Sequence, residues 1–100
     1  MNSKVNAIII SEADNVAVAI EPINKDDVVY YLDKKGNTIE ITALDDIKIY
    51  HKIAIVDIKK NEPVVKYGEH IGFAIRDIKI GEHIHDHNIE GRRENLEAIE

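Results

Sequence analysis

Three histidines at alternate positions near the end of the chain are the residues best suited to chemistry. They are His83, His85 and His87, and in an extended strand side chains two residues apart project from the same face. Ile84 and Asp86 would then face the opposite way. Neutral imidazole is a common metal ligand and changes charge near neutral pH, so it can also transfer protons. The spacing predicts a row of imidazoles along the last strand, although a solvated polar face has the same pattern.

The composition limits the partners and metal sites that are available. The chain has 100 residues, 13 basic and 19 acidic, and the resulting net charge of −6 disfavours nucleic acid and anionic membranes as partners. It has no cysteine, so any metal would need histidine, carboxylate or amide ligands. The first residues lack the apolar core of a signal peptide, and no apolar run approaches a membrane span. We expect a soluble cytoplasmic protein.

Short alternating apolar segments predict the strands that must position the histidines. Isoleucine and valine dominate the apolar residues, and both suit pleated strands. We expect strands at 5–10 and 15–20, and a hairpin of strands 28–32 and 38–42 around the polar loop 33–37. The longest alternating run covers 47–58.

His51 lies within that longest run, on the same parity as Ile49, Ile53 and Ile55. A histidine on this face either points into the core with a hydrogen-bond partner or projects beyond the end of the sheet. Both possibilities remain open from the sequence.

A weak internal repeat precedes the histidines. Asp57-Ile58-Lys59-Lys60-Asn61-Glu62 recurs twenty residues later as Asp77-Ile78-Lys79-Ile80-Gly81-Glu82. Asn61 aligns with Gly81, and because these residue types best tolerate a left-handed backbone, we expect the same turn in both copies. Extended runs should follow the turns at 63–67 and 83–87, with a bend at 68–72 between them.

Many short strands and tight turns, without alternating helices, predict an all-β domain with a barrel-like or folded-ribbon architecture. We expect this domain to cover residues 1–90. Residues 91–100 contain good helix formers but are few and polar, so we expect a short helix or a tail there.

Four blocks of this sequence resemble a known family. They are Asp14-Asn15-Val16-Ala17-Val18-Ala19, His51-Lys52-Ile53-Ala54, Val65-Lys66-Tyr67-Gly68-Glu69-His70-Ile71-Gly72 and His83-Ile84-His85-Asp86-His87-Asn88. In this order, over residues 8–90, they resemble the SAF domain, the β-clip module of altronate and galactarate dehydratases, and also the small subunit of sulfolactate sulfo-lyase. This chain has Asn61 where the family usually has glycine, and His83 near a position that usually carries a bulky aromatic residue.

The resemblance implies a hydroxy-acid lyase that removes water or sulfite from a sugar acid or related carboxylate. It also implies a divalent metal such as iron, held mainly by a large catalytic subunit. We therefore expect this chain to be a small subunit, inactive alone, whose partners are that large subunit and an anionic hydroxy-acid substrate.

β-Elimination from a hydroxy acid needs a base beside the carboxylate, an acid or metal for the leaving group, and cations that hold the carboxylate. We expect His85 and His87 to be the catalytic acid/base groups or, alternatively, metal ligands. The expected substrate-binding residues are Lys66, Asn88, His51 and Lys52. The module is also expected to act as a lid that excludes water.

Two other classes of function fit the same residues. A carbohydrate- or carboxylate-binding module would use the lysines and histidines for recognition alone, and direct binding by the isolated chain would identify it. A structural module that stabilises a partner would tolerate replacement of every surface histidine. Because one fold can host unrelated functions, the fold does not decide among these classes.

Overall fold

The computed structural model describes residues 5–91, which form nine short strands and no helix. The strands are β1 (Ala7–Ile8), β2 (Val16–Ala19), β3 (Val28–Leu32), β4 (Thr38–Thr42), β5 (Lys52–Ala54), β6 (Pro63–Lys66), β7 (Glu69–Ala74), β8 (His83–Ile84) and β9 (Ile89–Glu90). The expected all-β class is confirmed. The described residues include no helix that could cross a membrane. The helix or tail expected at 91–100 lies, after Gly91, outside the described residues.

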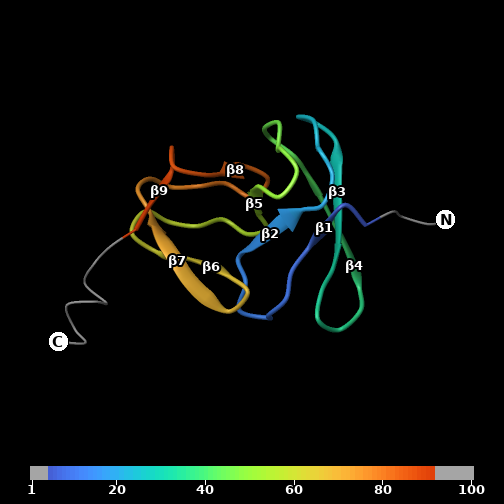
Figure 1. Ribbon diagram of the computed structural model, residues 1–100, viewed down its shortest axis with the longest axis horizontal. Coiled ribbons are helices and arrows are strands. Elements are labelled where there is room, and N and C mark those ends of the chain that lie inside the picture. Colours follow the sequence, from blue (N-terminus) through green and yellow to red (C-terminus); the bar gives the residue numbers. More distant parts are fainter. Residues whose placement is uncertain (1–4, 92–100) are drawn as a thin grey trace.

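The strands form three antiparallel sheets. A four-stranded sheet has the order β1-β2-β5-β8, a ribbon pairs β3 with β4, and a third sheet has the order β6-β7-β9. Figure 1 shows β2 and β5 between the β3–β4 ribbon on one side and the β6–β7–β9 sheet on the other. The central sheet therefore connects the two halves of the molecule.

Each half has its own hydrophobic cluster. The first includes Ala17, Ile23, Val29, Tyr31, Ala43, Ile47 and Ile53. The second consists of Val16, Ala54, Ile58, Val64, Ala74, Ile78 and Ile84. Neighbouring residues of β2 and β5 enter different clusters, because successive side chains of a strand point to opposite faces. Both faces of β2 are consequently buried, and its sequence is a continuous apolar run, whereas β5 buries Ile53 and Ala54 and leaves Lys52 half-buried.

The expected repeat is confirmed as a pair of matching turns. Asn61 has φ 75° and Gly81 has φ 96°, so both occupy the left-handed region. Ile58 and Ile78 exchange two backbone hydrogen bonds, with N···O distances of 2.8 and 2.7 Å. The two copies therefore lie against each other across a local pseudo-two-fold relation, rather than only following one another in sequence.

Within residues 5–91 the turn occurs four times, as part of a nine-residue segment. Each segment begins with a fully buried alanine, has a buried isoleucine four positions later, and has a positive-φ residue next to last. The segments are 19–27, 43–51, 54–62 and 74–82. In the last pair Ala74 N donates to Glu62 O at 2.9 Å, and Ala74 O accepts from Asn61 N at 2.7 Å. The first pair makes the corresponding contacts.

The expected long strand at 47–58 is wrong. Only Lys52–Ala54 is a strand, whereas Ile47 and Ile58 each make an isolated bridge and Tyr50 has φ 70°. The alternating apolar pattern arises because two turn segments, each burying an isoleucine, flank a three-residue strand. Apolar residues at alternate positions therefore did not indicate one continuous strand here.

The other local predictions vary in accuracy. The hairpin of 28–32 and 38–42 is confirmed with both boundaries. The strands expected at 5–10 and 15–20 form but are shorter. The bend expected at 68–72 is wrong, because β7 begins at Glu69 and the reversal is the two-residue turn Tyr67-Gly68, with φ 56° and 80°. Positive φ at both positions is the geometry of the tightest hairpin turns.

Candidate functional site

The extended run expected at 83–87 is wrong beyond Ile84. The strand β8 ends there, and residues 85–88 form a turn. Asn88 closes this turn: its N–H donates to His85 O at 3.0 Å, and its side-chain Oδ1 accepts from His85 N at 3.0 Å. The three histidines consequently do not form a row on one extended strand.

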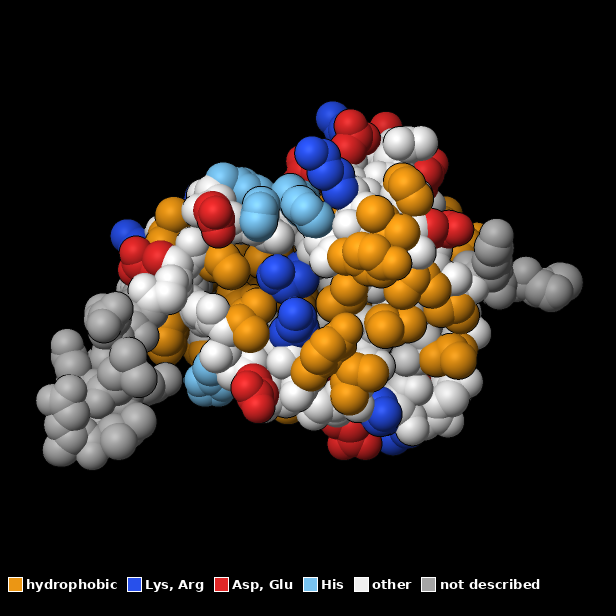
Figure 2. All heavy atoms as spheres, viewed as in Figure 1, with side chains coloured by type: hydrophobic (Ala, Val, Ile, Leu, Met, Phe, Trp, Pro, Cys, Tyr) orange, Lys and Arg blue, Asp and Glu red, His pale blue; other side chains and the backbone are white. Residues whose placement is uncertain are grey.

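The imidazoles nevertheless meet, and a fourth joins them. The His83 ring centroid lies 5.1 Å from that of His51, 5.8 Å from that of His85 and 5.3 Å from that of His87. The rings of His51 and His85 are 4.8 Å apart. We term these four residues the histidine cluster. Figure 2 shows several histidine side chains gathered along the upper edge of the molecule, with another histidine at the lower left, away from them.

His51 and His83 are joined by a direct hydrogen bond. His51 Nδ1 and His83 Nε2 are 2.9 Å apart, so one ring donates and the other accepts. His51 therefore has a partner, as one alternative expected, but the partner lies at the surface cluster and not in the core. The pairing of β5 with β8 places Ile53 opposite His83 and so brings the two histidines together.

The surroundings of His51 and His83 favour the neutral form of these two rings. Burial lowers the pKa of His83 to about 4, and the neighbouring His51, His87 and His85 add to the effect. Burial also lowers the pKa of His51, with contributions from His85 and two nearby lysines. His83 is therefore neutral at neutral pH, and its lowered pKa makes it a weaker base than an ordinary histidine.

Lys52 follows His51 of the cluster directly in sequence, and a second lysine, Lys66, is close enough to Lys52 to affect its pKa. Lys52 is on β5 and Lys66 ends β6, and both are half-buried. Burial and the charge of Lys66 lower the pKa of Lys52, while Asp86 opposes them. The Lys66 ammonium lies 5.0 Å from the centre of the Tyr67 ring. Among residues 5–91 neither lysine forms an ion pair with a carboxylate, because the ion pair found there joins two other side chains.

Asn88 lies beneath the site and not on its surface. The residue is fully buried, and its Nδ2 donates to His83 O at 2.8 Å while Oδ1 accepts from His85 N. Direct substrate contact, as expected for Asn88, does not fit this placement. Its amide instead fixes the two backbone positions from which His83 and His85 project.

The sequence reasoning did not place His83 among the site residues, although the ring of His83 contacts the other three. The alternating spacing of His83, His85 and His87 could have identified His83 as a site residue. It also missed Asp45, whose Oδ2 accepts a hydrogen bond from His83 N at 3.0 Å. No local pattern marked Asp45, because it lies 38 residues from His83 in sequence.

The Asp14-Asn15 block has a structural explanation. Asp14 Oδ1 accepts from Gly68 N at 2.7 Å and Oδ2 from Ile10 N at 2.9 Å. The Asn15 side-chain Nδ2 donates to Pro63 O at 3.0 Å, and its Oδ1 accepts from Val65 N at 2.7 Å. These two side chains hold β6 and the Tyr67-Gly68 turn against β2, and so position Lys66.

The described residues do not present a ready metal site. No group of three or more histidine, aspartate or glutamate side chains within 5–91 is arranged to hold a metal ion. The ring centroids of His85 and His87 lie 5.8 and 5.3 Å from that of His83. No chemical step of this chain is therefore assigned to a metal that it holds itself.

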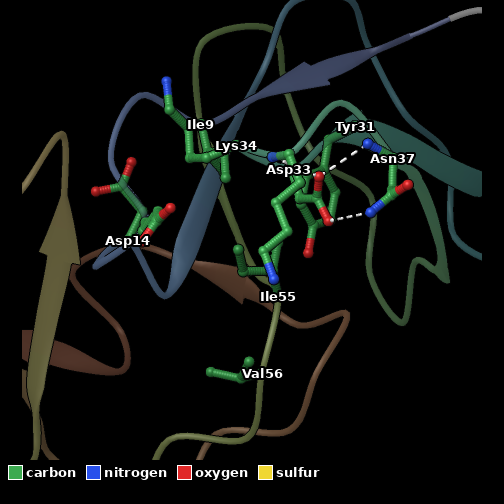
Figure 3. Close-up of a pocket in the computed structure, with 10 residues that line it drawn as sticks. Ile9, Asp14, Tyr31, Asp33, Lys34, Asn37, Ile55 and Val56 are labelled. Atoms are coloured by element: carbon green, nitrogen blue, oxygen red, sulfur yellow. Dashed lines mark hydrogen bonds between the residues drawn. The ribbon is translucent and has the colours of Figure 1, made fainter.

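A cavity of about 380 Å³ lies away from the histidine cluster (Figure 3). The β3–β4 loop forms one wall through Asp33, Lys34 and Asn37, and Ile9 and Ile55 form the apolar part. The Asp33 carboxylate already accepts two hydrogen bonds from Asn37, from its backbone N at 2.8 Å and from its side-chain Nδ2 at 3.3 Å. None of the expected site residues lines this cavity.

Comparison with known proteins gives the class of this domain. The family described as altronate/galactarate dehydratase SAF domain matches residues 5–92. The chain belongs to this family, and the resemblance inferred from the four sequence blocks is confirmed.

Relatives of two kinds share the domain. The chain is 48% identical over 79 residues to altronate dehydratase of Bacillus subtilis (strain 168), covering 79% of this chain and 15% of that protein. It is 37% identical over 87 residues to altronate dehydratase of Escherichia coli (strain K12), covering 87% and 16%. It is 42% identical over 58 residues to (2R)-sulfolactate sulfo-lyase subunit alpha of Paracoccus pantotrophus, covering 58% of this chain and 87% of that subunit. The chain therefore spans about one sixth of the altronate dehydratases that it matches.

Proposed function

We propose that this chain is the SAF component of a sugar-acid dehydratase or a related hydroxy-acid lyase. The observation that carries the proposal is the combination of four clustered imidazoles and two lysines without carboxylate partners among the described residues. The family supports a domain related to dehydratases and lyases. An anionic hydroxy acid needs both kinds of group, cations for its carboxylate and a proton-transfer group for the elimination.

In this proposal each group has a defined task. Lys66 and Lys52 hold the substrate carboxylate. His85 and His87, which are exposed on the turn, act as the acid/base groups that remove the proton beside the carboxylate and protonate the leaving hydroxyl. His51 and His83 keep a neutral hydrogen-bonded support behind them.

We further propose that the active site is shared with a larger catalytic chain. The altronate dehydratase relatives are several times longer than this chain, and other relatives are named as alpha subunits. A divalent metal held by the larger chain would stabilise the leaving hydroxyl as a Lewis acid. Closure of this module over the substrate would exclude water from the reaction.

The test is a complex reconstituted from this chain and the large chain that co-purifies with it. The double variant His85→Ala/His87→Ala should lose about 100-fold or more in turnover, the range of general acid–base catalysis. His70→Ala is the matched control, because His70 is an exposed histidine on β7 outside the cluster. Unchanged turnover in the double variant, with folding verified by circular dichroism, would remove the catalytic role.

A carboxylate-binding module without catalysis is the second candidate, and the unpaired lysines favour it. In that case the isolated chain should bind a hydroxy acid such as galactarate by calorimetry. The affinity should depend on Lys52 and Lys66 and not on His85 or His87.

A further inference from the structure

The outer edge of β4 is an open strand edge. The β3–β4 ribbon pairs five residues of each strand without a bulge, and within residues 5–91 no second strand pairs with β4. Figure 1 shows this ribbon at one end of the molecule, on the other side of β2 from β6 and β7. Such an edge presents a row of N–H and C=O groups that can pair with another chain.

The hydrogen bonds of the ribbon show which groups of β4 face outward. Just beyond the ribbon, Ala43 N donates to Asp27 O at 2.9 Å. Because hydrogen-bonded and non-hydrogen-bonded pairs alternate in an antiparallel ribbon, Ile41 and Ile39 are the next residues bonded to β3. The backbone groups of the three remaining residues of β4 therefore point away from β3: Thr38, Glu40 and Thr42.

A groove of about 570 Å³ lies along this edge. Its walls are Glu40, Ile41 and Thr42 of β4 and, from the turn segments, Leu44, Asp57, Lys79 and Ile80. No residue of β3 lines it, so the groove is at the edge of the ribbon. Leu44 and Ile80 are exposed apolar side chains. A strand added to β4 would turn alternate side chains toward this groove, and these two residues would cover them.

The charges along this edge favour a basic occupant and oppose a second copy of the chain. Glu40 is the charged residue of β4, and Asp57 and Lys79 in the groove leave one net negative charge there. A second copy that paired all three outward residues would place two Glu40 carboxylates directly opposite each other, which is destabilising. Each copy also carries a net charge of −6, which adds to the repulsion.

We propose that the outer edge of β4 binds an extended, basic segment of a partner protein by strand addition. The segment has a lysine or arginine opposite Glu40, and its neighbours on either side are β-branched apolar residues that face the groove. Backbone hydrogen bonds supply the affinity, while Glu40 and the groove select the side chains. No residue of the groove belongs to the proposed substrate site, so the inference does not rest on the lyase activity.

The test is a nuclear magnetic resonance titration of the full chain with the capped peptide Thr-Val-Lys-Val-Thr. Its lysine can lie opposite Glu40 while its valines face the groove. We expect a saturable shift of the backbone amide signals of Thr38, Glu40 and Thr42, and slower hydrogen exchange at these amides. The matched peptide Thr-Val-Glu-Val-Thr should bind about threefold to tenfold more weakly, because a like-charge pair replaces an opposite-charge pair.

Three variants complete the experiment. Glu40→Pro removes the outward N–H and none of the bonds to β3, and should weaken binding about tenfold. Glu40→Lys should reverse the preference, so that the glutamate-centred peptide binds more tightly than the lysine-centred one. Glu69→Lys makes the same charge change at another exposed strand glutamate and should leave the preference unchanged. Thermal melts establish that each variant folds.

Three results would overturn the proposal. The first is the absence of a saturable shift at the three outward amides, and the second is a peptide preference that Glu40→Lys does not change. The third is a dimer of the wild-type chain, seen by sedimentation, that Glu40→Pro dissociates, because the edge would then bind a second copy instead of a basic partner.

Discussion

The two pairs of turn segments have the same backbone but use their side chains differently. In the pair 54–62 and 74–82, Asp57 accepts a hydrogen bond from Ile80 N and Asp77 accepts one from Lys60 N, both at 2.9 Å. Glu62 and Glu82 close their own turns, accepting from backbone N–H groups at 2.8 and 2.9 Å. Every carboxylate of this pair is used for structure.

The other pair keeps only half of these contacts. Asp46 accepts from Lys25 N at 2.8 Å, but its counterpart in the first segment is Pro22. Asp27 accepts from Asn24 N at 3.0 Å, but its counterpart is His51.

His51 keeps the backbone turn and changes only the side chain. Its N–H donates to Lys48 O at 2.9 Å, as the N–H of Glu62 does to Lys59 O. Its ring bonds His83 instead of closing the turn. The comparison teaches that a turn stabilised mainly by its backbone does not need every side chain to close it. The side chain of His51 is free of that task, and it completes the histidine cluster.

The largest expected effect tests whether the turns of segments 54–62 and 74–82 are equivalent. A Cβ at Gly81 would lie 2.3 Å from Thr42 O, and the backbone there has φ 96°. Gly81→Ala should lower the free energy of unfolding by about 3 kcal/mol, through steric overlap and left-handed strain. Asn61→Ala, at the equivalent position, should cost about 1 kcal/mol. Urea unfolding measures both, and equal losses would mean that the contact with Thr42 has no energetic weight.

The next effect is the pH dependence of the free energy of unfolding that His51 and His83 produce. The folded protein holds the pKa of His83 at about 4, below the ordinary value of 6.5, so the unfolded chain binds this proton first. Stability should therefore fall as the pH decreases from about 6.5 to about 4, and change no further below that through this group. His51 contributes in the same direction.

Urea unfolding at pH 7.5, 5.5 and 4.5 measures this dependence. His83→Gln should show a smaller decline over the same interval. Aspartates whose pKa is lowered by folding, such as Asp14, lose their contribution only below about pH 4, so they do not mimic the effect. A decline that is identical in the variant would assign it to other groups.

The smallest expected effect on stability comes from making the two pairs alike. His51→Glu restores a carboxylate that can close the turn, as Glu62 and Glu82 do, while removing the bond to His83. We expect the free energy of unfolding to change by about 0.5 kcal/mol or less, because one surface hydrogen bond replaces another. The pKa of His83 should rise instead, since a nearby negative charge favours imidazolium. Nuclear magnetic resonance titration of the imidazole protons measures this, and an unchanged pKa would contradict it.

Local chemistry made part of this molecule predictable. The hairpin 28–32 and 38–42 followed from apolar segments around a polar glycine-containing loop, and the turns at Asn61 and Gly81 followed from residue types that accept positive φ. The two further turns carry Asp26 and Tyr50 at the positive-φ position. Tyrosine rarely adopts that conformation, so the residue type did not reveal the copy that contains Tyr50.

The sequence by itself determined the all-β class, the family, and the concentration of imidazoles between 83 and 87. Only the tertiary structure decided that His51 completes the cluster, that Lys52 and Lys66 influence each other, and that Asn88 lies underneath. The reason is physical. Turn and strand preferences act over a few residues, whereas the pairing of β5 with β8 joins segments about thirty residues apart, and the side chains that meet across it depend on the register of that pairing.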